Sequence, residues 1–98
     1  MTTLHSEKLT LLTNASATGS GVFATMGGRY VFRIDGTFSG ATCTLQMLSP
    51  DGSSWLTLQA FTAEGTATVE VPQGGTYRVL VASGPPSAMY ADMVRVPL

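Results

Sequence analysis

The sequence predicts an all-β fold, an antiparallel β-sandwich or jelly-roll-like barrel of about eight short strands. Apolar and polar residues alternate along much of the chain, as they do in strands with one buried face. Clusters of Gly, Pro, Asp and Ser interrupt this alternation at intervals of about ten residues, which is typical of turns between short strands. No stretch of useful length has the 3.6-residue apolar period of a helix, so we expect almost no helix.

The stretch 28–58 is the centre of the predicted fold. Its apolar residues keep one parity before the Ser39-Gly40 pair and another after it, and we expect them to face the core: Tyr30, Phe32, Ile34, Phe38, Cys43, Leu45 and Met47. Turns at Ser39-Gly40 and at 50–53 (PDGS) then divide the stretch into an antiparallel meander of three strands. Asp35-Gly36 is an alternative hairpin turn. The apolar alternation continues past it, which favours a glycine within one long, bent strand.

Before this stretch, the chain is predicted to contain an arm, two short strands and a linker. Residues 1–8 are polar without periodicity and are interpreted as an extended N-terminal arm, and KLTLLT at 8–13 as the first strand. The segment 14–21 (NASATGSG) is a linker of small polar residues that is either flexible or held against a partner. A second strand is expected at 20–25.

After this stretch, residues 59–65 are predicted as a loop in which Phe61 closes one end of the core. Three strands follow, at 66–71, 76–83 and 89–96, separated by turns at Pro72–Gly75 and Gly84–Ser87. In the first two of these strands, alternate residues are expected to face inward: Ala67, Val69, Val71, Tyr77, Val79 and Val81.

Length and composition indicate one domain with a weakly charged surface. The 98 residues fit a single domain spanning 1–98, and only 11% of them are charged, against about 25% in an average soluble protein. With a net charge of −1, copies of the chain repel one another weakly. Such a surface suits either a small soluble domain or a protein packed in an assembly. Five scattered basic residues and a pI near 5.6 argue against binding to nucleic acid.

Cysteine usage and hydropathy bear on where the protein is made. Cys43 is the single cysteine, so no internal disulfide can form, and folding in the cytosol is expected. Residues 1–8 lack the apolar region of a signal peptide, and no segment approaches the roughly 18 apolar residues of a membrane span. We therefore expect neither secretion by that route nor a membrane partner.

No residue pattern points to catalysis, a cofactor or a metal, so we expect a non-enzymatic protein. His5 lies in the arm and lacks the pocket and orienting partner of a general base. Cys43 has no histidine near it in sequence to activate it as a nucleophile, and one His with one distant Cys fits no metal-ligand spacing. Asp51 lacks the alternating carboxylates of a calcium loop and is interpreted as a turn residue.

Trp55 and the arginines of the strands need separate interpretation. Trp55 either caps the open end of the sandwich or is an exposed aromatic that stacks on a sugar or anchors a protein interface. Four arginines are expected to pair across strands with Asp35, Glu70 or Asp92, each pair contributing at most about 1 kcal/mol: Arg29, Arg33, Arg78 and Arg95.

Four sequence elements occur in a suggestive order: a strand beginning GRYVF, a strand GATCTLQ, a turn PDGSSW and a strand GTYRV, closed by MYADMVRVPL. In this order, the stretch 28–98 resembles small virion proteins of tailed bacteriophages, of the capsid decoration (cement) and head-fibre type. These are strand and turn signatures and not active-site motifs.

The resemblance implies a protein made in the host bacterial cytoplasm that binds the major capsid protein on the outer surface of the virion. There, as a dimer or trimer, it would stabilise the shell by bridging capsomers, with weak contacts adding up because each copy holds two or more subunits. The arm would lie along the lattice or add a strand to a sheet edge.

No motif residue of that family can be carried over as a binding residue. The candidate contacts with the capsid or another partner are therefore taken from the arm and the aromatic residues: Leu4, His5, Lys8, Trp55 and Tyr90. The alternative function is a carbohydrate-binding or adhesion module of a phage fibre or tail appendage. In that case Trp55, Tyr77 or Tyr90 would stack on sugar.

Overall fold

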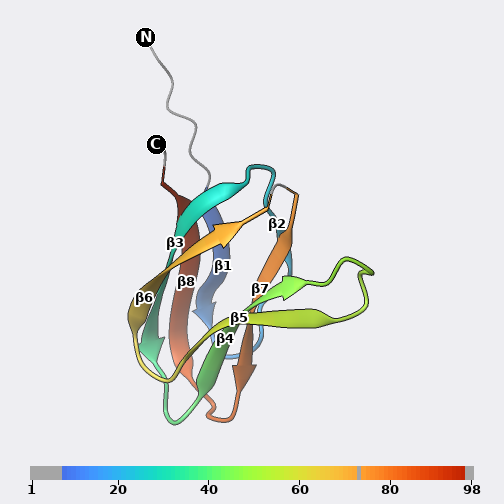
Figure 1. The fold of residues 1–98 in the computed structure, drawn as a ribbon. Coiled ribbons are helices and arrows are strands. Elements are labelled where there is room, and N and C mark those ends of the chain that lie inside the picture. Colours follow the sequence, from blue (N-terminus) through green and yellow to red (C-terminus); the bar gives the residue numbers. More distant parts are fainter. Residues whose placement is uncertain (1–7, 73, 97–98) are drawn as a thin grey trace.

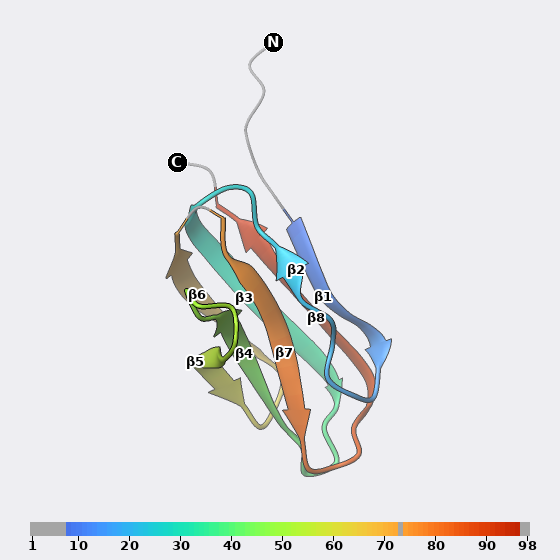
Figure 2. The ribbon, with the colours of Figure 1, turned by 90° about the vertical axis from the view of Figure 1, so that its right-hand side faces the viewer.

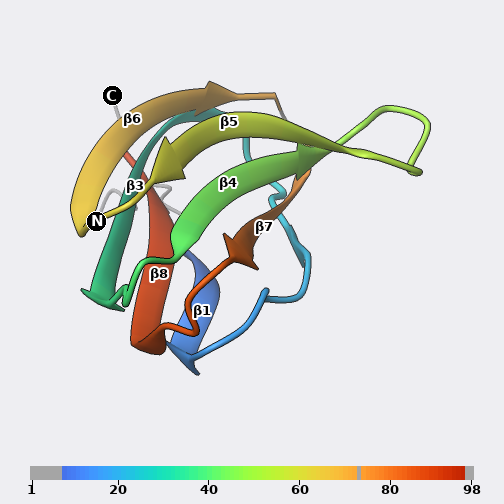
Figure 3. The same cartoon turned by 90° about the horizontal axis from the view of Figure 1, so that it is seen from below.

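The computed structural model describes residues 8–72 and 74–96, in which all regular structure is β-strand. The eight strands are β1 (Lys8–Ala15), β2 (Val22–Phe23), β3 (Gly28–Thr37), β4 (Thr42–Leu48), β5 (Trp55–Phe61), β6 (Gly65–Val71), β7 (Thr76–Ala82) and β8 (Ser87–Arg95). They form a first sheet, β1-β8-β3-β6, and a second sheet, β2-β7-β4-β5, both antiparallel (Figures 1 and 3). The predicted all-β sandwich is confirmed. None of these residues belongs to a helix that could cross a membrane.

The strand order is that of a jelly roll. The first four strands pair with the last four in reverse order, β1 with β8, β2 with β7, β3 with β6 and β4 with β5. The chain is therefore arranged like one long hairpin with its tip at β4–β5, wrapped around a core. The pairs β3–β8 and β4–β7 join the wrapped ribbon into two sheets. β2 is a short edge strand beside β7 (Figure 2).

The predicted three-strand meander over 28–58 is wrong. β3 lies in the first sheet between β8 and β6, whereas β4 lies in the second sheet between β7 and β5. The turn at Ser39 and Gly40 is present, with φ values of 50° and 81°, but it carries the chain from one sheet to the other. Parity indicates which face of a strand is buried and does not indicate which strands pair. A hairpin within one sheet and a crossing between two sheets therefore give the same sequence pattern. Only β4 and β5 form a hairpin, closed at the predicted 50–53 turn.

Gly36 lies within β3, which confirms the single long strand. The register between β3 and β8 shifts between Asp35 and Thr37, and Gly36 itself has a φ of +134°. A Cβ at this position would lie 2.6 Å from Sδ of Met89 and 2.7 Å from the carbonyl oxygen of Ala88. Glycine is needed here because β8 approaches the backbone of β3 too closely for a side chain.

The predicted loop at 59–65 is wrong in its first half, because β5 continues to Phe61. The register of β5 against β4 shifts between Leu45 and Gln46, so the strand carries a β-bulge. A bulge interrupts the alternation of apolar and polar residues, so the sequence pattern does not show that the strand continues past it. Phe61 packs against the core as predicted, with its ring centroid 5.4 Å from that of Phe32.

The predicted linker at 14–21 is tied to both sheets. Its first two residues end β1. Beyond them, the backbone N–H of Gly19 donates to the carbonyl of Val79 at 3.2 Å, and the hydroxyl of Thr18 accepts from the N–H of Val81 at 3.0 Å. The segment therefore runs along the edge of β7 and continues the line of β2. Residues 1–7 of the predicted arm lie outside the described residues, and Lys8 begins β1.

The core between the sheets is filled by residues of the expected parity. Its buried members are Leu9, Leu11, Leu12, Ala24, Tyr30, Phe32, Ile34, Phe38, Cys43, Leu45, Val71, Tyr77, Val79, Met89, Ala91 and Met93. Each large side chain of this kind contributes about 1.5–3 kcal/mol when it is fully buried. Met47 is half-buried, since the β4–β5 hairpin projects from the body of the sandwich (Figure 1).

Two fully buried tyrosines differ in how their hydroxyls are satisfied. The hydroxyl of Tyr30 donates to the carbonyl of Met26 at 2.6 Å. The hydroxyl of Tyr77 has no hydrogen-bond partner among the described residues, and its burial raises the pKa of the phenol. It packs directly beneath Gly75, where a Cβ would overlap it.

This contrast predicts opposite effects of removing the two hydroxyls. We expect Tyr30→Phe to lower the free energy of unfolding by about 1 kcal/mol, because it removes the hydrogen bond from the buried phenol to the carbonyl of Met26. Tyr77→Phe should leave stability unchanged or raise it by about 1 kcal/mol, because it removes an unsatisfied polar group. Urea unfolding of both variants beside the wild type tests this. Equal destabilisation by the two substitutions would contradict it.

Candidate functional site

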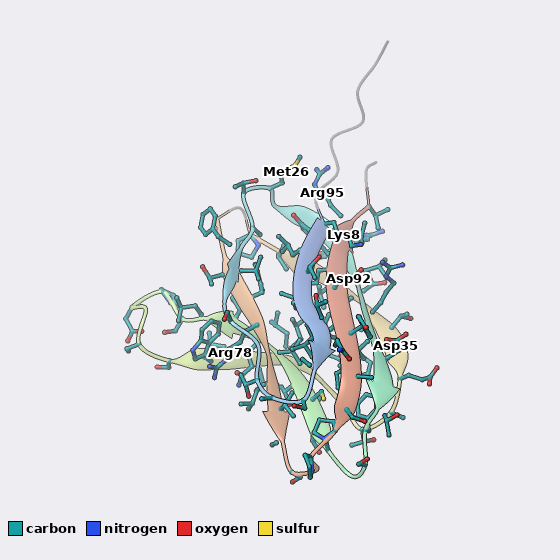
Figure 4. The ribbon with its side chains drawn as sticks, turned by 180° about the vertical axis from the view of Figure 1, so that it is seen from behind. Lys8, Met26, Asp35, Arg78, Asp92 and Arg95 are labelled. Atoms are coloured by element: carbon teal, nitrogen blue, oxygen red, sulfur yellow. The ribbon has the colours of Figure 1, made fainter. Side chains whose placement is uncertain are left out.

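An open groove of about 690 Å³ crosses the outer face of the first sheet, and we call it the outer groove. All four strands of the sheet and the β5–β6 turn supply its lining: Lys8, Thr10, Leu12, Thr13, Arg33, Ile34, Asp35, Glu64, Gly65, Thr66, Tyr90, Ala91 and Asp92. Figure 4 looks toward this face, with Lys8 labelled on β1, Asp92 on β8 and Asp35 on β3.

Strand parity explains why this face is polar. On β3, Arg33 and Asp35 flank the buried Ile34, and on β8, Tyr90 and Asp92 flank the buried Ala91. The alternation that directs apolar side chains into the core therefore directs charged side chains and one tyrosine to the outside. Register then places Asp92 opposite Arg33, and Tyr90 opposite Asp35.

One side of the outer groove is an ordered cluster of ion pairs. Nε of Arg33 donates to Oδ1 of Asp92 at 2.8 Å, and Nη2 donates to Oδ2 at 2.5 Å. Nζ of Lys8 lies 3.7 Å from the same Oδ2. Hydrogen bonding to Asp92 raises the pKa of the Arg33 guanidinium. The side chain of Asp92 is only 15% exposed, and its two-point contact orients the guanidinium of Arg33.

The other side of the groove has unused hydrogen-bonding groups and an aromatic surface. Among the described residues, the carboxylates of Asp35 and Glu64 have no hydrogen-bond or ion-pair partner. Tyr90 stands beside Asp35 with 48% of its surface exposed. The groove therefore combines fixed donors, free acceptors and an exposed ring.

The structure brings together two of the five candidate contact residues. Lys8 and Tyr90 both line the outer groove. Trp55 lies on the second sheet, and Leu4 and His5 lie outside the described residues.

Sequence reasoning missed Arg33, Asp35 and Glu64 as groove residues. Arg33 and Asp35 were expected only to form cross-strand pairs. Their outward parity was visible, but the pairing of β3 with β8 that places them beside Tyr90 was not.

Trp55 lies on the outer face of the second sheet and not at the open end of the sandwich. The guanidinium of Arg78 sits over its ring, with Cζ 4.3 Å from the centroid, and Nε of Arg78 donates to Oε1 of Gln46 at 2.9 Å. A Cβ at Gly21 would lie 3.3 Å from the indole, so the ring also packs against the 14–21 segment. One face of the tryptophan is therefore already occupied by a cation.

Tyr77, the third aromatic residue considered for sugar stacking, is fully buried. The structure overturns that role, because a ligand on the surface cannot reach its ring. Tyr90 is thus the aromatic residue of the three with a free and exposed surface in a groove.

The predicted cross-strand pairs are confirmed for two of the four arginines. Arg33 pairs with Asp92 as described, and Nη2 of Arg29 lies 3.3 Å from Oε2 of Glu70. Arg78 binds Gln46 and Trp55 instead, and Nε of Arg95 donates to the carbonyl of Gly27 at 2.9 Å.

Other candidate chemical groups have structural roles. Within 8–72 and 74–96, no three His, Cys, Asp or Glu residues are grouped so as to hold a metal ion. The pKa of Asp51 is lowered by hydrogen bonds from the hydroxyl of Ser49 and the N–H of Ser53, as expected for a turn residue. Burial raises the pKa of Cys43, so its thiol is neither accessible nor readily ionised.

Comparison with protein-family models, curated proteins and solved structures finds no match for this chain.

The burial of Cys43 predicts an inert thiol. At about pH 8, near the ordinary pKa of a cysteine, the native protein should not react with a disulfide reagent such as DTNB, because the raised pKa keeps the thiol neutral. Reaction should become complete in denaturing guanidinium chloride. Absorbance of the released thiolate measures both states. Rapid reaction of the native protein would contradict the buried placement.

Proposed function

We propose that this chain is a non-enzymatic structural protein that attaches to the outer surface of a phage capsid and bridges its subunits. The major capsid protein is the proposed partner, and the protein acts as a dimer or trimer on the virion. One structural observation supports this proposal above the others: the second sheet ends in an edge strand, β5, that carries none of the charged residues or prolines that commonly hinder pairing.

The sequence of β5, WLTLQAF, contains no charged residue and no proline. Edge strands of soluble proteins commonly carry lysine, proline or inward-pointing charge, because their unpaired N–H and C=O groups otherwise recruit strands from other chains. The bulge opposite Leu45–Gln46 twists this edge but adds no charge to it. β5 is therefore suited to accept a strand from a partner or from a second copy.

Apolar surface adjoins this edge. Leu56 is 44% exposed and stands opposite the half-buried Met47 on β4. A smaller pocket of about 280 Å³ beside it is lined in part by Met47, Pro50 and Pro72. A partner that covered Leu56 would add apolar burial to the backbone hydrogen bonds of the edge.

Composition and fold agree with attachment to a repeating surface. A net charge of −1 allows many copies to sit close together. Weak contacts suffice when each copy spans two or more subunits of a lattice. Jelly rolls occur among viral capsid domains, which is an analogy at the level of the fold and supplies no site.

A substitution on the edge strand β5 tests the proposed attachment to capsids. We expect Thr57→Lys, which places a charge on this exposed strand, to reduce binding to capsids by about tenfold or more. The matched control is Thr68→Lys, an exposed threonine on β6, the edge strand of the first sheet. Co-sedimentation of the purified protein with capsids prepared without it measures the binding.

Both substitutions lie on exposed strand faces and should change the free energy of unfolding by no more than about 0.5 kcal/mol. Circular dichroism and urea unfolding check that the variants fold. Failure of the wild-type protein to sediment with capsids would overturn the proposed function. Equal loss of binding in the two variants would exclude β5 as the contact.

A further inference from the structure

We propose that the outer groove binds a neutral carbohydrate, with a sugar ring packed on Tyr90 and its hydroxyls hydrogen-bonded to Asp35, Glu64 and Arg33. This site lies on the first sheet, whereas the capsid contact proposed above uses β5 of the second sheet. The inference does not depend on the capsid proposal.

The size and form of the groove suit a short oligosaccharide. Its volume of about 690 Å³ lies within the range of about 300–1,000 Å³ that is usual for small-molecule sites. The groove is open and crosses all four strands, so an extended chain can enter from the side. Gly65, which has no side chain, and Thr66 line it on the β6 side.

Tyr90 supplies the apolar part of the recognition. Tyr90 is 48% exposed on a central strand of the sheet, where β8 is paired with β1 on one side and β3 on the other. A tyrosine ring presents an apolar face and a polar hydroxyl, and a pyranose ring presents an apolar C–H face surrounded by hydroxyls. The two surfaces are complementary without any net charge on the ligand.

The polar groups around Tyr90 match hydroxyls that both donate and accept. Asp35 and Glu64 offer unpaired carboxylate oxygens as acceptors. Nε and Nη2 of Arg33 are fixed by Asp92, which leaves Nη1 as a donor held in a defined orientation. Donors and acceptors that are already in place reduce the entropy lost when a ligand binds.

Charge and backbone pairing exclude other ligand classes. The groove contains three carboxylates, Asp35, Glu64 and Asp92, against two cations, Lys8 and Arg33, which leaves a formal charge of −1 at neutral pH. An acidic sugar or a phosphate would therefore be repelled. An extended peptide could not add a strand to β8 or β3, because both are paired on both sides.

The test is titration of the ¹⁵N-labelled full chain with maltohexaose, cellohexaose and chitohexaose, and with an alginate oligomer as the acidic comparison, each to roughly 10 mM, where millimolar affinities are still visible. We expect at least one neutral oligosaccharide to shift amide signals of β1, β3, β8 and residues 64–66. The alginate oligomer should produce no such shifts, and the neutral binding should be insensitive to salt.

Three variants test whether the oligosaccharide binds in the outer groove. Tyr90→Ala should weaken binding by about tenfold or more, and so should the combined Asp35→Asn and Glu64→Gln substitutions. Phe23→Ala is the matched control, because Phe23 is an aromatic residue that is 57% exposed on the second sheet, and its removal should leave the affinity within about twofold. Tyr90 is exposed, so its truncation should leave the unfolding midpoint unchanged.

Several results would overturn the proposal. These are the absence of binding by every neutral oligosaccharide, binding of the alginate oligomer alone, or equal loss of affinity in Tyr90→Ala and Phe23→Ala. Loss of capsid binding in Tyr90→Ala, with no glycan bound by the wild type, would assign the groove to a protein partner instead. Each of these outcomes is separate from the effect of Thr57→Lys on the β5 edge.

Discussion

One apolar core shared by both sheets is the constraint on which the structure depends. Every strand contributes at least one buried or half-buried residue to it, from Leu9 on β1 to Met93 on β8. Because six of the seven connections pass from one sheet to the other, the strands of each sheet are held together by pairing of segments that are far apart in sequence. Removing a residue from the centre, such as Phe32 or Leu45, would therefore loosen both sheets at once. No disulfide assists, since Cys43 is a free thiol within this core.

Occupation of the inner faces by the core leaves the outer faces and edges for other tasks, and the two sheets use them differently. On the second sheet, Arg78 covers one face of Trp55, and the 14–21 segment packs against its ring. The indole of Trp55 is therefore already in contact with other parts of the fold. On the first sheet, the outer face is hollowed, and Tyr90 stands exposed between an ordered ion pair and two unpaired carboxylates. Gly65 and Thr66 line that hollow on the β6 side.

The same separation keeps the two proposed contact surfaces apart on the molecule. The edge of β5 offers backbone groups and the apolar side chain of Leu56, which suit a protein. The outer groove offers polar side chains and one exposed tyrosine over the paired strands β3 and β8, which suits a ligand rich in hydroxyls. A protein anchored by one sheet edge and presenting a sugar-binding face on the other sheet would join a surface to a glycan. The two contacts differ in their chemistry, so they can be removed one at a time.

The fold class, the number of strands and the inward parity of residues such as Tyr30, Cys43 and Val79 could be predicted from the sequence, because period-two burial and turn chemistry are local properties. The sequence also indicated that Gly36 lies within a strand and that strand arginines pair with Asp35, Glu70 or Asp92, which two of the four do. The tertiary structure alone decided that β3 and β4 lie in different sheets, that β5 continues past its bulge to Phe61, and that Asp35, Glu64 and Tyr90 share one groove. These features depend on which strands pair across long separations, and strand pairing leaves no mark in the alternation of a single strand.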